Sequence, residues 1–304
     1  MKLIFTLILI LFLLSSCIQN PFNKTPGNSG KGSLDVTILT SPKLDGKTLN
    51  EGDTFTVDVD VINSLDVPIQ GRICLRDQTT DTFGGISSTG ENCDNLDLAP
   101  AERLDDSGKL FPDKGTYLFP LDGDFSYRNL DVTSLPNQIF VDLFYELQTQ
   151  NEGIACIERR GVGKCQTTQN LNIAPKGVPL EATKIIISPS YRGDEVILNA
   201  EVVLSQKEEG TILTAGSVLD PNTAGTQRVK VDVEINRNLA KCNTLNQGYV
   251  EFKKGQNEKI IKCTLPVSIP LEYENVPVKV TLEYGFQKTV QGPKFNLKKE
   301  DLIA

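Results

Sequence analysis

The sequence predicts an all-β protein of two similar sandwich domains, and three observations support this fold class. First, apolar and polar residues alternate in several stretches, which places the apolar ones on one face of a strand; examples are residues 54–61 (TFTVDVDV), 228–235 (RVKVDVEI) and 278–284 (VKVTLEY). Second, no segment after Leu14 keeps a helical period over three turns. Third, four sequence blocks of the first half recur in the same order in the second half.

The repeat indicates where the two domains lie. The matched blocks are VTILTSP (36–42) with TKIIISP (183–189), GDTFTVDVDV (52–61) with GDEVILNAEV (193–202), LPNQIFVDLFY (135–145) with VPVKVTLEY (276–284), and LNI (171–173) with FNL (295–297). We therefore expect a first β-domain at residues 33–174 and a second at 181–297, each of ordinary domain size. Residues 175–180, rich in Pro and Gly, would be a short stiff linker, and residues 298–304 a tail.

Each copy has the order of elements expected of an immunoglobulin-like sandwich: an edge-type strand, a Ser-Pro turn, a long alternating strand, a disulfide-tied middle and a final hairpin. In the first copy, GDTFTVDVDVINSLDVPIQG (52–71) resembles the opening strands of CARDB and related immunoglobulin-like modules of prokaryotic surface proteins. This resemblance implies a cell-surface adhesion or spacer module. The cysteine content departs from that pattern, because such modules commonly lack disulfides.

The N-terminal residues have the composition of an export signal. Residues 3–14 (LIFTLILILFLL) are almost purely apolar. This run is shorter than the roughly 20 residues that a membrane-spanning helix needs, and it is typical of the core of a signal peptide.

The run ends in Leu14-Ser15-Ser16-Cys17, which resembles a lipobox, the site where the cysteine thiol accepts lipid. We expect residues 1–16 to be a signal peptide and Cys17 to be lipidated, with an ordinary secretory signal as the alternative. Residues 17–32 are polar and rich in Pro, Gly, Ser and Asn, so they would form a flexible tether between the lipid and the folded part. The expected localisation is extracytoplasmic, on the cell surface or the periplasmic face of a membrane.

Six cysteines follow Cys17, and an even set in an exported chain is typical of disulfides. Six cysteines allow about 15 pairings, and sequence alone proves none of them. Proximity favours the pairs Cys74–Cys93, Cys156–Cys165 and Cys242–Cys263. Metal binding by thiolates is the alternative, and the absence of any CxxC spacing disfavours it.

Composition excludes several classes of function. The chain has no histidine, which removes Ser-His-Asp and Cys-His catalysis and the usual zinc sites. Removal of Lys2 with the signal peptide leaves 30 Lys+Arg against 39 Asp+Glu, a net charge of about −9, which argues against nucleic acid as a partner. We expect a protein without catalytic activity or cofactor that contacts a protein or glycan of the cell envelope. A ligand-binding lipoprotein of a transport system and an exported carboxylate-based glycosidase are the alternatives.

The differences between the two copies indicate candidate binding residues. The first copy inserts NEGIACIERRGVGKC (151–165) before its last strand. We expect an extended hairpin, tied by Cys156–Cys165, whose tip carries Arg159, Arg160 and Lys164 on an otherwise acidic protein. Arginine pairs bidentately with carboxylates, so these residues are candidates for partner binding, with a solvated charged hairpin as the alternative. Because the first domain follows the lipid anchor, we expect this hairpin on the membrane-proximal domain.

The second difference is residues 79–135, a long polar stretch of the first copy. Asp105, Asp106, Asp122 and Asp124 in this stretch are candidate calcium ligands, because Ca²⁺ takes oxygen ligands from such loops. Their spacing matches no EF-hand, and aspartate is common in turns for its own backbone hydrogen bonds. We therefore expect no metal, with a structural Ca²⁺ as the alternative.

Overall fold

The computed structural model is described here for residues 34–299, except residues 80, 87–91, 105–108, 175, 194, 219–226, 254 and 269–271. Within these residues the predicted all-β class is confirmed, because they contain strands, the short 3-10 helix η1 (Asp81–Phe83) and no α-helix. The predicted signal peptide, the lipidation site Cys17 and the tether lie outside the described residues. Among the described helical residues, none belongs to a helix that could cross a membrane.

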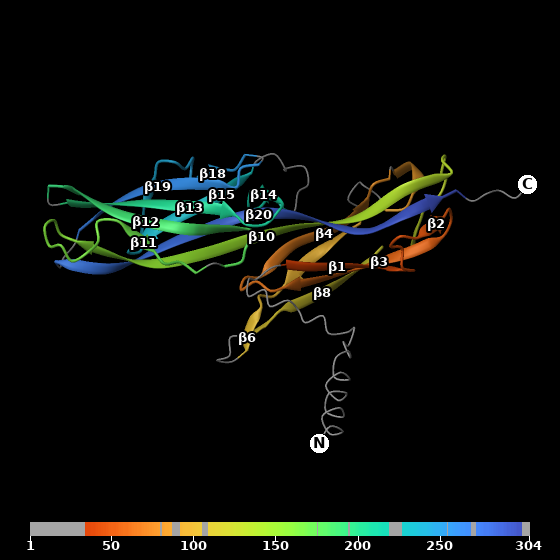
Figure 1. Ribbon diagram of the computed structural model, residues 1–304, viewed down its shortest axis with the longest axis horizontal. Coiled ribbons are helices and arrows are strands. Elements are labelled where there is room, and N and C mark those ends of the chain that lie inside the picture. The colour runs from red at the N-terminus through yellow and green to blue at the C-terminus, as the bar shows by residue number, and fades with distance from the viewer. Residues whose placement is uncertain are drawn as a thin grey trace, which may run out of the picture. The chain divides into compact units, whose positions relative to one another are not determined.

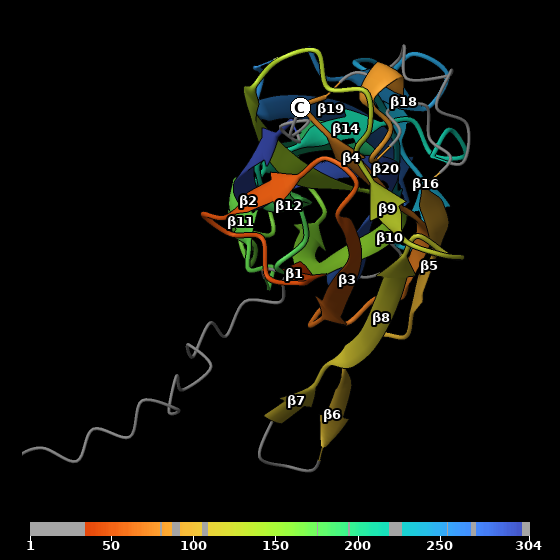
Figure 2. The same ribbon diagram turned by 90° about the vertical axis from the view of Figure 1, so that its right-hand side faces the viewer.

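A four-stranded sheet and part of a nine-stranded sheet face each other and form what we call the first sandwich (Figure 1). The strands of the four-stranded sheet are β1 (Leu34–Ser41), β3 (Thr54–Asn63), β8 (Asp113–Phe119) and β9 (Phe125–Ser126). The facing strands are β2 (Thr48–Asn50), β4 (Ile69–Asp77), β5 (Cys93–Leu98), the first half of β10 (Ser134–Glu158) and the second half of β20 (Tyr273–Lys298). The hairpin of β6 (Glu102–Leu104) and β7 (Lys109–Phe111) projects from this sandwich (Figures 1 and 2).

The second sandwich is built from a five-stranded sheet and the remainder of the nine-stranded sheet. The strands of the five-stranded sheet are, in spatial order, β11 (Gln169–Leu171), β12 (Leu180–Arg192), β13 (Glu195–Gln206), β19 (Glu258–Val267) and β17 (Lys241–Cys242). The nine-stranded sheet supplies the other halves of β10 and β20 together with β14 (Thr211–Leu213), β15 (Arg228–Ile235), β16 (Asn238–Leu239) and β18 (Tyr249–Glu251).

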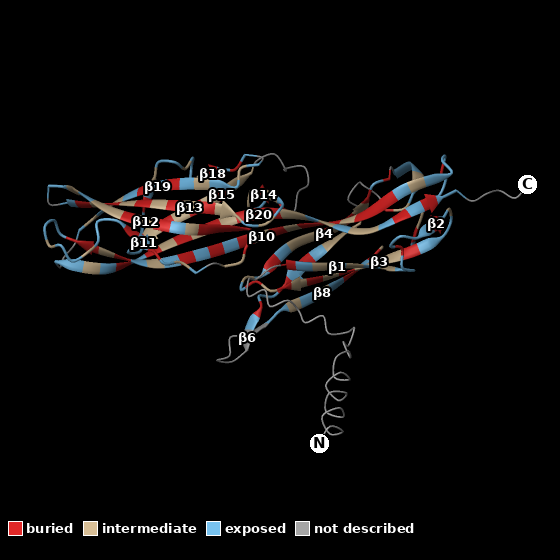
Figure 3. Ribbon diagram, in the orientation of Figure 1, coloured by how far each residue is buried: buried red, intermediate tan, exposed pale blue. Residues whose placement is uncertain are grey.

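The alternation seen in the sequence sets the two cores. Every second residue of β3 and of β13 is buried, and the same red and pale pattern continues along the facing strands (Figure 3). The buried apolar residues of these two strands are Phe55, Val57, Val59, Val61, Val196, Leu198, Ala200, Val202 and Leu204. The ring of Phe55 lies 6.3 Å from the ring of Phe295 on the facing sheet. Burying one such aliphatic or aromatic side chain contributes about 1.5–3 kcal/mol to folding.

The two longest strands, β10 and β20, pair antiparallel along their whole length, from Ser134 opposite Lys298 to Glu158 opposite Tyr273. The first half of β10 also pairs with β4, and the first half of β20 also pairs with β15. Each strand therefore begins in one sandwich and ends in the other. The described residues accordingly belong to one compact unit.

The sandwiches do not coincide with the sequence segments 33–174 and 181–297. Residues 147–158 of β10 lie in the second sandwich, and residues 286–298 of β20 lie in the first. The segment expected to be a linker is also part of the second sandwich, since Val178 and Leu180 are fully buried there. The Leu180 backbone N–H donates to the hydroxyl of Tyr284 at 3.1 Å.

Three disulfides reinforce this arrangement, and they join the pairs that sequence proximity favoured. Cys74–Cys93 links the directly paired strands β4 and β5, and Cys242–Cys263 links β17 and β19. Cys156–Cys165 ties the end of β10 to the loop that follows it. Each bridge closes a loop of 9 to 21 residues, which removes conformational freedom from the unfolded chain and stabilises the fold by a few kcal/mol.

Because both sandwiches share β10 and β20, we predict that they unfold together. Ile73→Ala in the first core and Leu198→Ala in the second should each lower the free energy of unfolding by about 2–5 kcal/mol. Both side chains are fully buried. Calorimetry should show one transition, shifted to lower temperature by either variant, while the exposed Lys43→Ala leaves it unchanged. Two separate transitions, each sensitive to only one variant, would contradict the shared-strand interpretation.

Candidate functional site

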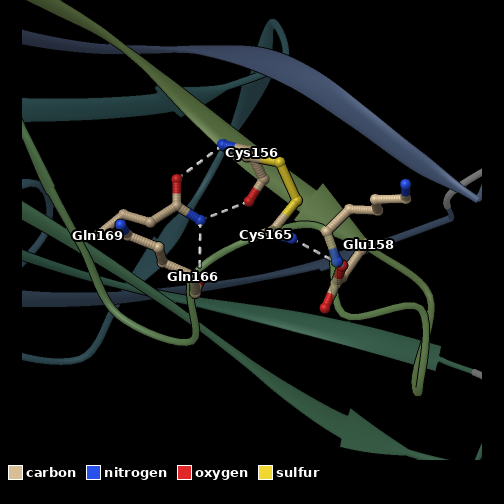
Figure 4. The surroundings of a disulfide bond; sticks show 6 residues. Cys156, Glu158, Cys165, Gln166 and Gln169 are labelled. Atoms are coloured by element: carbon tan, nitrogen blue, oxygen red, sulfur yellow. Dashed lines mark hydrogen bonds between the residues drawn. A yellow bond between two sulfur atoms is a disulfide. The ribbon is translucent and has the colours of Figure 1, made fainter.

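The candidate site is the loop between β10 and β11, residues 159–168, which we call the basic loop (Figure 4). It carries the three predicted binding residues Arg159, Arg160 and Lys164, and all three are exposed. All three lie on this one loop, at the end of the second sandwich where β10 ends. Two anchors hold this short loop in place.

One anchor is the disulfide together with a glutamine amide. Cys156 and Cys165 are 5.5 Å apart at Cα, and Gln169 reaches back across this bridge (Figure 4). Its Oε1 accepts from the N–H of Cys156 at 2.8 Å, and its Nε2 donates to the carbonyl of the same residue. The Nε2 also donates to the Gln166 carbonyl at 3.2 Å. The Gln169 amide thus pairs with both backbone groups of Cys156, close to the end of β10 where the loop begins.

The second anchor is the carboxylate of Glu158, on the other side of the disulfide (Figure 4). It accepts hydrogen bonds from the backbone N–H groups of Lys164 and Cys165, the latter at 2.8 Å. These backbone donors, the Cys165 N–H above all, hold the pKa of Glu158 below its ordinary value. The Glu158 carboxylate therefore bonds to the backbone of the loop. These bonds hold the loop that carries the cations.

Two glycines make the turn of the loop possible. Gly161 and Gly163 have φ values of 88° and 72°, a region that L side chains rarely adopt. No atom lies within 4 Å of where a Cβ would stand at either position, so backbone conformation rather than space requires glycine. The sequence R-R-G-V-G-K can therefore turn at Gly161 and Gly163, between the two arginines and Lys164.

Aromatic and apolar side chains surround the basic loop. Tyr273, paired with Glu158 in the ladder, is 48% exposed, and Ile154 is 71% exposed. Tyr191 lies near enough for the charge of Glu158 to add to the effect of burial in raising the pKa of its hydroxyl, and the next residue, Arg192, is exposed. Tyrosine and arginine are the residues most enriched at protein interfaces. The arrangement suits the binding of an anionic group, because an anchored loop carries the cations and partly exposed aromatic residues lie near its start.

The structure corrects two expectations about this segment. Residues 151–158 are not an arm of a hairpin; they continue β10 and pair with β20, while β11 pairs with β12 in the opposite sheet. The basic loop consequently lies in the second sandwich and not, as expected, in the first. The physical reason is that the chain, after turning at the basic loop, does not return alongside β10: its next strand, β11, pairs with β12 in the facing sheet.

The calcium candidates are distributed differently. Asp105 and Asp106 lie outside the described residues, while Asp122 and Asp124 are exposed in the turn between β8 and β9. Among the described residues, no group of three or more acidic, cysteine or histidine side chains is placed to hold a metal. The structure therefore gives no support to a Ca²⁺ site at Asp122 and Asp124.

A buried polar network in the first sandwich was not predicted. The carboxylate of Asp77 accepts from the hydroxyl of Tyr127 at 2.5 Å and from Thr79 Oγ1 at 2.7 Å. Asn137 donates to both Asp77 and Tyr127, at 3.2 and 2.9 Å. Burial, and then the charge of Asp77, raise the pKa of Tyr127 well above its ordinary value, so it donates at all physiological pH. Every polar atom of Asp77 is paired, as the burial of a charge requires.

Beside this network lies a shallow hollow of about 340 Å³, lined in part by Gln78, Gln138, Lys294 and Asn296. The hollow coincides with an irregularity in the ladder, where β20 has one more residue than β10 between Gln138 and Phe140. Bulges of this kind occur at sheet edges and next to binding sites. The alternation of the sequence gave no signal for this feature, because the pairing partners are about 150 residues apart.

Comparisons with models of protein families, with curated proteins and with solved structures found no match to this chain.

The anchoring role of Glu158 predicts a pH-dependent loop. Because the pKa of Glu158 is lowered in the folded protein, its stabilisation of the loop is present at neutral pH and is lost as pH falls through that lowered pKa. We expect the amide resonances of Lys164 and Cys165 to move together in an NMR titration over this range. In Glu158→Gln both amides should exchange faster with solvent at neutral pH and lose the titration. Unchanged amide exchange in Glu158→Gln would show that the disulfide alone orders the loop.

Proposed function

We propose that this protein is a membrane-anchored extracytoplasmic lipoprotein that acts as a non-catalytic interaction module in adhesion or envelope assembly at the cell surface. The observation that carries the proposal is the basic loop, which presents three exposed cations on an acidic protein and whose backbone is held by a disulfide, a carboxylate and an amide. An anchored backbone of this kind loses less conformational entropy on binding than a free loop. Arg159, Arg160 and Lys164 would bind carboxylate or other anionic groups on a protein or glycan of the envelope.

The shared strands support a presenting role. The chain enters the first sandwich at Leu34, whose carbonyl accepts from Lys288 Nζ at 2.9 Å, near the middle of β20. From Lys288 to Tyr273, which lies opposite the start of the basic loop, β20 runs 15 residues, or about 50 Å at 3.3 Å per residue. The strand is paired throughout this distance, so the basic loop would be held well away from the point where the tether joins.

The disulfides and the N-terminal pattern support the location. Three disulfides are expected in an oxidising compartment outside the cytoplasm, where a chain with a signal peptide would be delivered. All six cysteines after Cys17 are used in these bridges. Cys17 is thus the single cysteine left to accept lipid, which agrees with its place directly after the apolar run.

Lipidation predicts membrane association that depends on one sulfur atom. Cys17→Ser should move the protein from the membrane fraction to the soluble fraction, because each buried CH₂ of an acyl chain contributes about 0.8 kcal/mol to membrane binding. Ser15→Ala, which keeps a small residue before the cysteine, should fractionate with the wild type. The measurement is immunoblotting of separated fractions with mass spectrometry of the N-terminal peptide. A Cys17→Ser protein that stays on the membrane without detergent would refute the lipid anchor.

The basic loop predicts charge-dependent binding. Arg160→Glu combined with Lys164→Glu should lower the capture of partners from solubilised envelope by about tenfold or more, because charge-assisted hydrogen bonds contribute roughly 1.5–3 kcal/mol each. Capture by the wild type should also weaken as salt rises. The matched control reverses two exposed lysines elsewhere, Lys43→Glu with Lys241→Glu, at the same change in net charge. Equal losses in both variants, or none in either, would remove the basic loop from the proposed function.

A further inference from the structure

The second half of β10 is the edge of its sheet. β4 pairs with β10 only as far as Glu146, which lies opposite Gln70, whereas β20 accompanies β10 to Glu158. From Leu147 onward, no described strand pairs with the side of β10 that faces away from β20. In the first sandwich β4 lies beside β10 on this side. In the second sandwich no described strand takes the corresponding place.

The hydrogen bonds of Cys156, at the end of this edge, show in which direction its backbone groups point. The N–H and C=O of Cys156 both bond to the side chain of Gln169, so they point away from β20. Backbone groups alternate sides along a strand, which gives the same direction to Gln148, Gln150, Glu152 and Ile154. In the described part of the chain, these four residues have no backbone hydrogen bond on that side. We call residues 147–155 the open edge.

The corresponding edge in the first sandwich is covered at both ends. There the second half of β20 is the outer strand; β14, at the crossing between the sandwiches, pairs with it at 285–287, and β2 pairs with it at 296–298. Between these strands the Lys294 carbonyl accepts from the Gly46 N–H at 2.7 Å, and Pro293 lies at the bulge. Short covering strands, prolines and bulges are the usual means by which proteins block edge-to-edge pairing. Between Glu146 and Cys156 the open edge has no covering strand, proline or bulge among the described residues, and its one charged side chain is the exposed Glu152. The neighbouring segment contacts inward positions there: Leu171 lies beside Gly153, and the Ala174 carbonyl accepts from Asn151 Nδ2 at 3.2 Å.

Both ends of the open edge are stopped. At one end β4 already occupies the row beside Glu146, and at the other end Gln169 occupies the backbone of Cys156. The unpaired length between these stops matches an extended segment of about eight residues, or roughly 26 Å at 3.3 Å per residue. The 25-residue β10 of a second copy would run into β4 at one end and Gln169 at the other. An edge-to-edge dimer through this strand is thus disfavoured by the same contacts that bound the edge.

Charge and polar groups indicate the chemistry of the occupant. The open edge leads directly into the basic loop, so a segment lying along it would bring its end to Arg159, Arg160 and Lys164. Thr149 and Asn151, almost fully buried beneath the edge, have Oγ1 and Oδ1 atoms without a hydrogen-bond partner among the described residues. On the outer face Gln148, Gln150, Glu152 and Ile154 are exposed beside the edge. Acidic side chains of an extended segment would complement the cations of the basic loop, while Asn151 Oδ1, an acceptor, would need a donor such as a hydroxyl group.

We propose that the open edge binds a short, extended, acidic segment of another protein, which adds as a strand to β10 and places its carboxylates on the basic loop. This inference rests on the proposed function and names the partner class for the same site. Main-chain hydrogen bonds to residues 148–154 supply affinity, and the cations of the basic loop select acidic sequences, as in other proteins that bind peptides by strand addition.

The probe is a capped, fluorescent nine-residue peptide that alternates valine or threonine with glutamate. We expect it to bind the wild type and to protect the amides of Gln148, Gln150, Glu152 and Ile154 from hydrogen exchange. A lysine-for-glutamate peptide should bind about tenfold or more weakly, and a peptide methylated on alternate backbone nitrogens should not bind measurably. Failure of the acidic peptide to bind, equal binding of the methylated peptide, or protection restricted to the basic loop would overturn the inference.

The matched variants are Gln150→Pro and Gln150→Val. Proline is tolerated where the N–H of an edge strand faces solvent, so Gln150→Pro should keep the β10–β20 ladder and weaken the acidic peptide by about tenfold or more, while Gln150→Val changes it less than about twofold. Circular dichroism checks the fold of each. If Gln150→Pro does not fold, the methylated peptide on the wild type decides the question. A wild-type dimer that Gln150→Pro dissociates would overturn the inference in favour of self-association.

Capture from solubilised envelope separates this inference from the proposed function. If Arg160→Glu with Lys164→Glu loses the partners while Gln150→Pro retains them, the basic loop acts alone and strand addition is refuted. If both variants retain the partners, the proposed function fails as well. Loss in both variants, with retention by Gln150→Val, supports the open edge and the basic loop as one site.

Discussion

The antiparallel ladder between β10 and β20 is the interaction on which the rest of the structure depends. Its register runs from Ser134 opposite Lys298 to Glu158 opposite Tyr273, with a single irregularity near Phe140. Each sandwich closes only because one strand enters it from each copy of the repeat. At the crossing, Tyr145 lies opposite Phe286 and Leu147 lies opposite Tyr284, and all four side chains are buried. The two cores thus meet in a continuous apolar contact with no linker between them.

The crossing has an approximate two-fold symmetry that follows from the repeat. Tyr145 and Tyr284 are matched positions of the two copies, and each pairs with the residue two places beyond its counterpart. Each copy therefore gives its last strand to the other, as in domain swapping but within a single chain. Gly285 at this point has Val218 and Leu213 so close that a Cβ would lie 2.5 and 3.0 Å from their side chains. Lys288 adds a bond to Glu208 at 3.2 Å, which joins β20 to a turn of the second sandwich.

The parts of the fold that sequence predicted are those set by local pattern. Alternation located β3, β13 and β15, and proximity gave the disulfide pairs, because both depend on residues close in the chain. The exchange of last strands could not be predicted in this way, since it depends on pairing between residues more than 100 positions apart. The matched blocks LNI and FNL illustrate this limit: Leu171 pairs with Ile185 in β12, whereas Leu297 pairs with Leu135 in β10. The two similar sequences therefore lie in different sheets, LNI in the five-stranded sheet and FNL in the nine-stranded sheet.

The misplacement of the basic loop has a similar cause. Residues 147–155 keep the period of a strand, but the inward positions hold Thr149 and Asn151 instead of apolar residues, and Gly153 follows. A polar run with a glycine is typical of a hairpin arm on the surface. The pattern therefore did not predict that β10 continues through these residues with buried inward positions. That the three cations share one loop could be predicted, because their spacing in the sequence is local.

Polar residues at inward positions, an uncovered edge and a fixed cationic loop occur together on one stretch of β10. In the first sandwich, the equivalent stretch of β20 carries Val290, Phe295 and Leu297, with β2 and β14 beside it. The related edge of β20 is covered by β14 and β2. In the described part of the chain the edge of β10 has no such strand, and only the Gln169 side chain occupies its backbone, at Cys156. The disulfide Cys156–Cys165 holds this end of the edge and the basic loop at fixed separation. A segment that bound to either would therefore meet the other without any rearrangement, which is the arrangement that favours binding to both at once.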